Sequence, residues 1–515
     1  MAGPLASNQE MRVRFPPTAL LTGREWRGCD LRSLRGHCEP HSDVPDLRVV
    51  AQLGSAPVWG TGGRRFKSGL LDSTGTSPGV GRLLREQELP GSTPGYPTVI
   101  ATTAMRIVPR RHCGRHQSCT VHNREVVAMP TVISDKLISW ASDVDDQTIR
   151  QAQMASRLSI VPGHVALMPD AHVGKGATVG SVIPTQSAII PAAVGVDLGC
   201  GMIASRLTAS ASDLPDNIGA LLPEVEKAVP AGVGRGHDSQ TLSSAQWLAA
   251  HKPPHTMTQK QSATAAAQFG TLGSGNHFFE VCLDEADAVW VVLHSGSRGI
   301  GNHLAQAHIA QARSLAKALA LGLEDLDLAW FTQGTAEFEA YIADMLWAQE
   351  YAMASRLEMA HAATAVLLAA LPPRTRVAET INCHHNFATQ EVHGGTQLWV
   401  TRKGAIKAAV GDRGVIPGSM GTASYIVTGL GNQLSWQSCS HGAGRRMSRA
   451  QARKTFTADD LAKAMVGKAW LSDRAGHLID EIPASYKDID QVMADQADLV
   501  RIDHTLHQVL NYKGT

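Results

Sequence analysis

The sequence lacks any uninterrupted apolar run long enough to span a membrane, which takes about 18 residues or more. Its first residues also lack the basic segment followed by an apolar segment that is typical of a secretory signal. These two absences argue against a membrane-spanning or exported chain. We therefore expect a cytoplasmic globular protein, whose 43% hydrophobic content is enough for a large core.

Cysteine and net charge are also low. The eight cysteines are spread along the 515 residues with no dense spacing, which argues against a disulfide framework and for a reducing compartment. The formal net charge is only +1, and residues 129–515 hold 30 Lys and Arg against 36 Asp and Glu. Any contact with nucleic acid must therefore use a local basic surface, because the protein as a whole has no basic field.

Residues 1–128 differ in composition from the rest of the chain. They contain 15 glycines and sixteen arginines with a single lysine, and they show no sustained period of 2 or 3.6 residues. We expect a poorly ordered or weakly structured extension here, followed by one large domain over residues 129–515. The alternative is a translation start placed too far upstream, with Met105 or Met129 as the real beginning.

The rest of the chain is organised around residues 191–202, an apolar run that ends on Asp197, Cys200 and three glycines. This pattern predicts a buried strand that enters a tight turn, where the glycines let Asp197 and Cys200 converge. A carboxylate and a thiolate at one point indicate a metal site. A glycine-rich turn with a buried cysteine and a capping aspartate is the alternative.

Periodicity predicts both helices and strands around this stretch. Helices are expected at 135–158, at 302–322, at 335–370 and in most of the tail up to Lys513, strands at 202–207, 289–293 and 398–402, and a glycine loop at 411–421. Glycine-rich loops follow several of the strands, and such loops commonly carry functional sites.

Five strand-to-loop junctions each carry a metal-ligating side chain beside glycine. They hold Asp197 with Cys200, His277, His294, His385 and His441. One such histidine is commonly structural, but the repeated pattern indicates a shared site. A thiolate, a carboxylate and imidazoles suit a divalent transition metal, and ligand softness alone favours zinc. Their number exceeds the ligands of one tetrahedral zinc, so either some of them only support the ligands or the thiolate bridges two ions.

Longer motifs at these junctions make a family resemblance specific. They are Asp-Leu-Gly-Cys-Gly at 197–201, Gly-Ser-Gly-Asn-His-Phe at 273–278, His-Ser-Gly-Ser-Arg-Gly at 294–299, His-His-Asn at 384–386 and Ser-Cys-Ser-His-Gly-Ala-Gly-Arg at 438–445. From about residue 129 to Lys513 the chain resembles the RtcB family of tRNA-splicing and RNA-repair ligases. The resemblance implies an α+β fold, with mixed sheets and flanking helices in a single catalytic domain.

The resemblance also implies an enzyme that uses GTP and manganese to join an RNA 3′-phosphate or 2′,3′-cyclic phosphate end to a 5′-hydroxyl end. His441 matches the histidine that becomes guanylylated, and Asp170 matches the acid that orients it. Two Mn²⁺ ions are implied, one held by Asp197, Cys200 and His277 and the other by Cys200, His294 and His385.

Further matched positions are those that hold the guanine nucleotide. Asn276 and Arg298 match phosphate contacts. Glu280 matches the acceptor for the guanine edge, and Tyr486 matches a stacking ring. The full implied set is Asn276, Glu280, Arg298, Ser419, Ser424, Gly442, Ala443, Gly444, Tyr486 and Lys513.

Contacts with the RNA backbone are less specified. The candidates are Lys175, Arg402, Lys403, Lys407 and Arg445, with solvated surface charge as the alternative for each. Two other functions stay open at this point. One is a dinuclear-metal phosphodiesterase that forms no covalent nucleotide, and the other is a non-catalytic RNA-binding protein stabilised by a metal.

Overall fold

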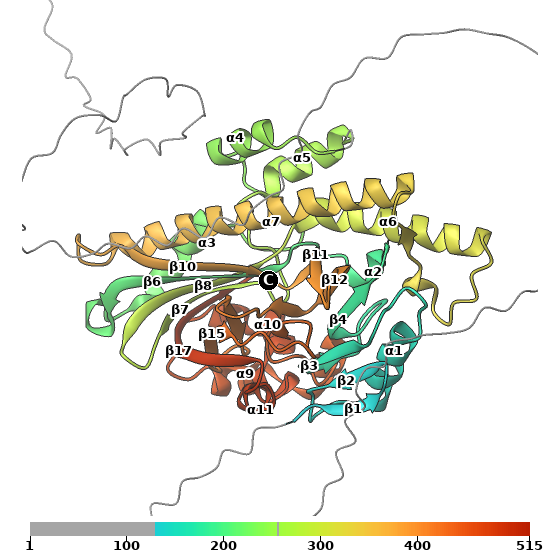
Figure 1. The fold of residues 1–515 in the computed structure, drawn as a ribbon. Helices are drawn as coiled ribbons and strands as arrows, with labels where there is room; N and C mark the ends of the chain where they lie inside the picture. Colours follow the sequence, from blue (N-terminus) through green and yellow to red (C-terminus); the bar gives the residue numbers. More distant parts are fainter. Residues whose placement is uncertain (1–128, 255–256, 515) are drawn as a thin grey trace, which may run out of the picture. The chain divides into compact units, whose positions relative to one another are not determined.

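The computed structural model describes residues 129–254 and 257–514, which fall within one compact unit. The expectation for residues 1–128 lies outside this part of the chain. The described residues form mixed sheets with flanking helices, so the predicted α+β class is confirmed (Figure 1). Among their helices, none combines the length and the apolar character needed to cross a membrane.

Two large sheets form the framework of this unit. The larger one runs in spatial order through β10 (Val377–His384), β6 (Gly201–Ser210), β8 (Ala288–Ser295), β7 (Phe278–Leu283), β17 (Val500–Lys513), β15 (Ser424–Gly429) and β14 (Arg413–Pro417). The other runs through β1 (Thr131–Ser134), β2 (Leu137–Ser139), β3 (Val165–His172), β4 (Val179–Thr185), β12 (Thr396–Lys403) and β11 (Asn386–His393). Two small sheets pair β13 (Ala405–Lys407) with β16 (Ser438–Ser440) and β5 (Ala188–Ile189) with β9 (Phe331–Thr332).

The two long helices are α6 (Arg298–Ala318) and α7 (Ala336–Ala369), and α7 packs along β6, β8 and β10 (Figure 1). No glycine or proline interrupts α7, and the Thr335 side chain caps its first turn by accepting from the Phe338 N–H. The shorter helices are α1 (Asp146–Ser156), α2 (Pro191–Val194), α3 (Leu222–Ala228), α4 (Leu242–Ala250), α5 (Gln259–Gln268), α8 (Arg449–Thr455), α9 (Ala458–Ala464), α10 (Ala475–Leu478) and α11 (Ile489–Asp495). Short 3₁₀ turns lie at Ala211–Asp213, Ile218–Leu221, Leu326–Leu328, Ser472–Arg474, Ile479–Glu481 and Pro483–Ser485.

Side-chain alternation along the central strands separates two cores. On β8, Val291 and Leu293 belong to the core that includes residues of α7 and α3. Trp290 and Val292 belong to a second core on the other face of the sheet. Because successive residues of a strand point to opposite faces, His294 shares the second face and points away from α7.

Four expectations about elements are wrong or only partly right. The run at 191–194 is a short helix instead of a strand, because Pro191 supplies a preset helical φ at its first turn. The helix expected at 135–158 is limited to Asp146–Ser156, because Leu137–Ser139 pairs with β1 and β3. Pairing also makes strands of Arg413–Pro417, within the expected glycine loop, and of Val500–Lys513, within the expected helical tail. Tertiary pairing overrides local propensity in these segments.

Candidate metal centre and nucleophile pocket

Antiparallel pairing brings the predicted site segments together at one end of the larger sheet. Met202 on β6 lies opposite His294 on β8, and His294 in turn lies opposite Phe278 on β7. On the other side of β6, Gly201 lies opposite His384. Segments that are far apart in sequence therefore end side by side, each with a predicted ligand at or next to its end.

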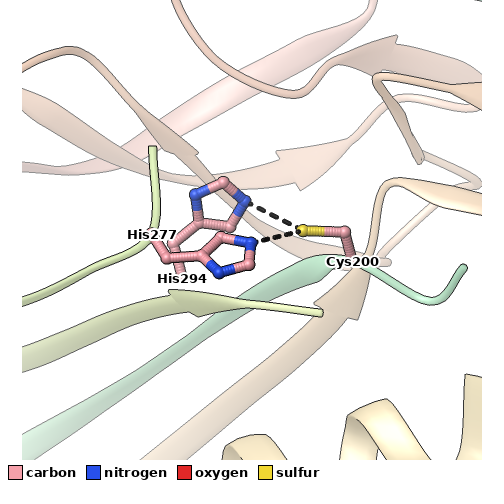
Figure 2. Close-up of side chains that lie close together, drawn as sticks. All are labelled: Cys200, His277 and His294. Carbon is pink, nitrogen blue, oxygen red and sulfur yellow. Dashed lines mark hydrogen bonds between the residues drawn. The ribbon is translucent and has the colours of Figure 1, made fainter. Parts of the chain in front are cut away.

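Cys200 is the centre of this group. It lies in the turn between α2 and β6, its side chain is buried, and Gly199 before it takes a positive φ of 67°. The Cys200 Sγ atom is 3.3 Å from His294 Nε2 and 3.5 Å from His277 Nε2 (Figure 2). The ligand atoms of these three residues all lie within 4.8 Å of one another, which is close enough for them to share an ion.

Hydrogen bonds determine which ring nitrogen faces the thiol. Nδ1 of His277 lies 2.8 Å from the Leu272 carbonyl oxygen, and Nδ1 of His294 lies 3.0 Å from the Asn276 carbonyl oxygen. A carbonyl oxygen can only accept, so each Nδ1 carries a proton and Nε2 is the nitrogen that faces Cys200. Burial also lowers the pKa of His294, which keeps that ring neutral.

Asp197 and His385 extend the cluster on two sides. The Oδ2 atom of Asp197 is 3.2 Å from His277 Nε2, and Nε2 of His385 is 2.8 Å from Nε2 of His294. Burial lowers the pKa of His385 well below its usual value, so this ring is also neutral. A cation that binds between Asp197 Oδ2 and His277 Nε2 would have both atoms as ligands. This donor set of a thiol, a carboxylate and neutral imidazoles fits a divalent transition metal.

His441 lies beside this cluster and is oriented by Asp170. His441 follows β16, and its Nδ1 is 2.5 Å from Oδ2 of Asp170, which lies on β3 and is fully buried. The His441 backbone N–H donates to the same oxygen at 3.2 Å. Because Asp170 accepts a hydrogen bond from Nδ1–H, the lone pair of the neutral His441 ring is on Nε2. The ring centroids of His441 and His385 are 4.7 Å apart, so a potential nitrogen nucleophile adjoins the metal-type cluster.

A cavity of about 520 Å³ opens at these residues. Its size falls within the roughly 300–1,000 Å³ of small-molecule sites. Its walls include Cys200, His294, His385 and His441. The predicted nucleotide contacts in its walls are Asn276, Glu280, Ser419, Ser424, Gly442, Ala443, Gly444, Tyr486 and Lys513.

Arg298 is the predicted nucleotide contact that is not among the wall residues of this cavity. Its Nη1 atom is 3.5 Å from Nδ1 of His277, and its guanidinium occupies the space where a Cβ of Gly273 would lie. Arg298 thus lies on the Nδ1 side of the His277 ring, the side away from Cys200. In this position it adds positive charge next to the metal-type cluster.

A buried acid, Glu481, organises the end of the cavity near Lys513. Its Oε2 atom accepts from Lys513 Nζ at 2.9 Å and from the Tyr486 hydroxyl at 2.8 Å. Burial would raise the pKa of Glu481, but Lys513 and Arg449 together lower it to about 2. The Arg445 guanidinium lies 4.7 Å from the centroid of the Tyr486 ring. Sequence reasoning missed Glu481, because no motif distinguishes it from a surface acid.

Glu280 is a second buried acid in the same region, with the opposite shift. It is 2% exposed and accepts from Asn511 Nδ2 at 2.6 Å. Burial raises its pKa to about 8, and the positive charge of Lys513 offsets only part of this effect. In the free protein Glu280 is therefore mostly protonated near neutral pH.

The predicted RNA-contacting cations divide into two groups. Arg402 is fully buried and pairs with Glu391 at 2.6 Å, so the prediction that Arg402 contacts the RNA backbone is wrong. Lys403 is also buried, and its Nζ donates to the carbonyl oxygens of Ala192, at 2.9 Å, and Lys175. Lys175, Lys403 and Arg445 line the cavity, while Lys407 is exposed elsewhere.

Fold and site together define a class of protein. It is an α+β protein in which an aspartate-oriented histidine adjoins a thiol and imidazole metal-type centre, within a cavity of nucleotide size. A family model described as "tRNA-splicing ligase RtcB" matches residues 151–514. The chain belongs to this RtcB family.

Curated relatives agree with this assignment. RNA-splicing ligase RtcB1 of Escherichia coli is 43% identical over 403 residues, which cover 75% of this chain and 97% of the relative. tRNA-splicing ligase RtcB of Nanoarchaeum equitans is 29% identical over 445 residues, covering 72% and 90% of the two chains. That of Archaeoglobus fulgidus is 30% identical over 414 residues, covering 66% and 86%.

Proposed function

We propose that this protein is an RNA ligase that joins 3′-phosphate or 2′,3′-cyclic phosphate ends of RNA to 5′-hydroxyl ends, using GTP and a guanylate bound covalently to His441. Membership of a family of RNA-splicing ligases supports the activity itself. The observation that carries the covalent step is the Asp170 carboxylate on Nδ1 of His441, which leaves Nε2 as the nitrogen that can attack, in a ring beside the metal-type cluster.

The reaction proceeds in three transfers. Nε2 of His441 attacks the α-phosphorus of GTP, an N–P bond forms and pyrophosphate leaves. An oxygen of the RNA 3′-phosphate then attacks that phosphorus, and the N–P bond breaks to leave GMP on the RNA end. Finally, the 5′-hydroxyl attacks the 3′-phosphorus, GMP leaves and a phosphodiester bond is formed. A cyclic phosphate is first opened by water.

The residues of the cluster would hold two divalent ions. Asp197, Cys200 and His277 form one set of ligands, and Cys200, His294 and His385 form the other. Two ions bound here, Mn²⁺ by family, supply positive charge that stabilises the phosphate groups of both substrates. Glu280 and Tyr486 bind the base, and Asp170 keeps the proton on Nδ1 of His441 throughout.

Labelling with GTP tests the nucleophile. Full-length protein incubated with α-labelled GTP and Mn²⁺ is expected to keep the label after denaturation, and His441→Ala is expected to keep none. His361→Ala is the matched control, because His361 is an exposed histidine on α7. The denatured protein is separated on a gel and its radioactivity is counted.

Other outcomes distinguish the rival functions. Label retained by His441→Ala would refute His441 as the nucleophile. Cleavage of RNA by wild-type protein without any labelled protein would identify a metal-dependent phosphodiesterase. RNA binding with neither label nor cleavage would identify a non-catalytic RNA-binding protein.

A further inference from the structure

Arg356 is a fully buried arginine in the middle of α7. Arginine is almost never fully buried unless it is paired. Among residues 129–254 and 257–514, no carboxylate forms an ion pair with Arg356 by the distances that define the other ion pairs of the protein. Its guanidinium instead contacts backbone carbonyls and neutral side chains at one end of the larger sheet.

These contacts reach three segments of the chain. Nη1 of Arg356 donates to the carbonyl oxygen of Gly199 at 2.6 Å and to that of Ser295 at 3.1 Å. Nε donates to Oδ1 of Asn382 at 3.0 Å. Nη2 lies 3.1 Å from Nδ1 of His384, which itself donates to the Gly199 carbonyl oxygen at 2.8 Å. A planar guanidinium with five fixed donors is suited to hold several acceptors at set positions, as one ammonium is not.

Each of the three segments carries a predicted metal ligand at the next residue. Gly199 precedes Cys200, Ser295 follows His294, and His384 precedes His385. The strands pair just beyond the guanidinium, since Gly201 lies opposite both Ser295 and His384. Arg356 therefore ties together the backbone on which the Cys200, His294 and His385 side chains stand.

We propose that Arg356 is a positioning residue that sets the spacing of the Cys200, His294 and His385 ligands through its hydrogen bonds to Gly199, Ser295 and Asn382. The proposal rests on the metal centre of the proposed function. It assigns Arg356 no contact with a metal ion, with GTP or with RNA. The role depends on the planar set of guanidinium N–H donors, and a positive charge alone would not provide it.

Cobalt binding tests this role without depending on ligase activity. Co²⁺ is titrated into metal-free full-length protein, and the thiolate-to-cobalt charge-transfer band and the d–d bands are followed. Wild-type protein is expected to show both. Arg356→Lys keeps the positive charge but loses the planar set of guanidinium donors, and Arg356→Gln loses both. Each is expected to bind Co²⁺ about 10- to 100-fold more weakly, as for other residues that support metal ligands, and to shift the d–d bands.

Two further variants separate positioning from general loss of stability. Trp347→Phe removes a part-buried hydrogen bond of the same helix, to the carbonyl oxygen of His251 at 2.9 Å, which belongs to none of the ligand segments. It is expected to keep wild-type affinity and spectrum. Of the contacts of Arg356, Asn382→Ala removes only the one made by Nε. It is expected to weaken Co²⁺ binding, but by a smaller factor than the Arg356 variants do. This variant tests the positioning role if Arg356→Gln does not fold.

The contrary results are distinct for the two proposals. Wild-type affinity and bands in Arg356→Lys, or in Asn382→Ala where Arg356→Gln does not fold, would refute the positioning role and leave the metal centre intact. A wild-type protein without a thiolate-to-cobalt band would refute the metal centre, and the role of Arg356 with it. Equal losses in Trp347→Phe and Arg356→Gln would also refute the specific role.

Discussion

At the scale of single residues, the site depends on which nitrogen of each histidine is free. Two backbone carbonyls and the Asp170 carboxylate accept hydrogen bonds from Nδ1–H of His277, His294 and His441. In the neutral form of each ring, Nε2 therefore carries the lone pair, which is available to a metal ion or to an electrophilic phosphorus. The Nε2 atoms of His277 and His294 both lie within 3.5 Å of Cys200 Sγ, so the carbonyls on Nδ1 orient both rings toward the same atom.

The first prediction concerns Asp170. In Asp170→Asn, the amide can donate to Nδ1 of His441, which moves the ring proton to Nε2 and removes the nucleophilic lone pair. The rate of protein guanylylation is expected to fall on the order of 10³- to 10⁴-fold, as in other catalytic histidines that lose their carboxylate. Single-turnover labelling with α-labelled GTP measures it, and a loss below tenfold would contradict the orienting role.

The second prediction concerns the pH dependence of stability through Glu280. Its pKa is about 8 in the folded protein against an ordinary value of 4.5. Between these pH values the folded state keeps a proton that the unfolded state has lost, so the free energy of unfolding falls as the pH rises. Glu280→Gln is expected to remove this decline, which is at most about 1.4 kcal/mol per pH unit for one proton.

Urea unfolding of wild type and Glu280→Gln at several pH values across this interval measures the effect. Parallel pH profiles for the two proteins would show that Glu280 ionises normally in the folded state. A wild-type stability that rises with pH while the variant stays level would reverse the sign and contradict the burial argument.

At the scale of elements, the contact of His441 with Asp170 depends on how closely one loop approaches one strand. The loop after β16 passes directly over β3 at Gly444, where φ is +73° and a Cβ would collide with the Asp170 carbonyl oxygen. Lys487 supports the same strand from the side, because its Nζ donates to the carbonyl oxygens of Pro169, at 3.1 Å, and Ala171, at 2.8 Å. The contact between His441 and Asp170 therefore requires that the loop approach β3 closely at Gly444 and that Lys487 keep β3 in position.

The third prediction tests this approach. In Gly444→Ala the loop must move away from β3, and guanylylation is expected to fall on the order of 100-fold, as for displacements of about 1 Å in other active sites. Gly467→Ala is the matched control, because Gly467 has a similar φ of +79° but nothing within 4 Å of a Cβ. It is expected to lose about 1–2 kcal/mol of stability and no guanylylation rate. Similar rates in both variants would refute the argument.

At the scale of the whole molecule, every predicted ligand, nucleophile and nucleotide contact lies between Asp170 and Lys513. The two large sheets and α7 bring most of these residues to one cavity, while Asp170, His277 and Arg298 are not among its wall residues. The fourth prediction follows from this distribution. A chain that begins at Met129 is expected to ligate RNA with 3′-phosphate and 5′-hydroxyl ends within about twofold of the full-length rate, because removing residues outside the site leaves its contacts unchanged. A loss of more than tenfold would assign a role to residues 1–128.

Much of the site was predictable because its residues stand in recognisable local patterns. Cys200, His294 and His441 each stand within two residues of a glycine in a recognisable motif, and this pattern is visible without the fold. Arg356, Glu481 and Lys487 were not predictable in the same way. An arginine, an acid and a lysine without a motif read as surface charge, and only burial shows that they support the site.

The sequence by itself determined the chemical identity of the site and the α+β class. A thiol, a carboxylate and several histidines beside glycine turns are covalent facts of the chain, and they limit the chemistry whatever the fold. Tertiary structure alone decided which ring nitrogens are free, that Glu280 is protonated while Glu481 is ionised, and that residues 191–194 are helical. These properties depend on burial and on partners distant in sequence, and local patterns contain no information about either.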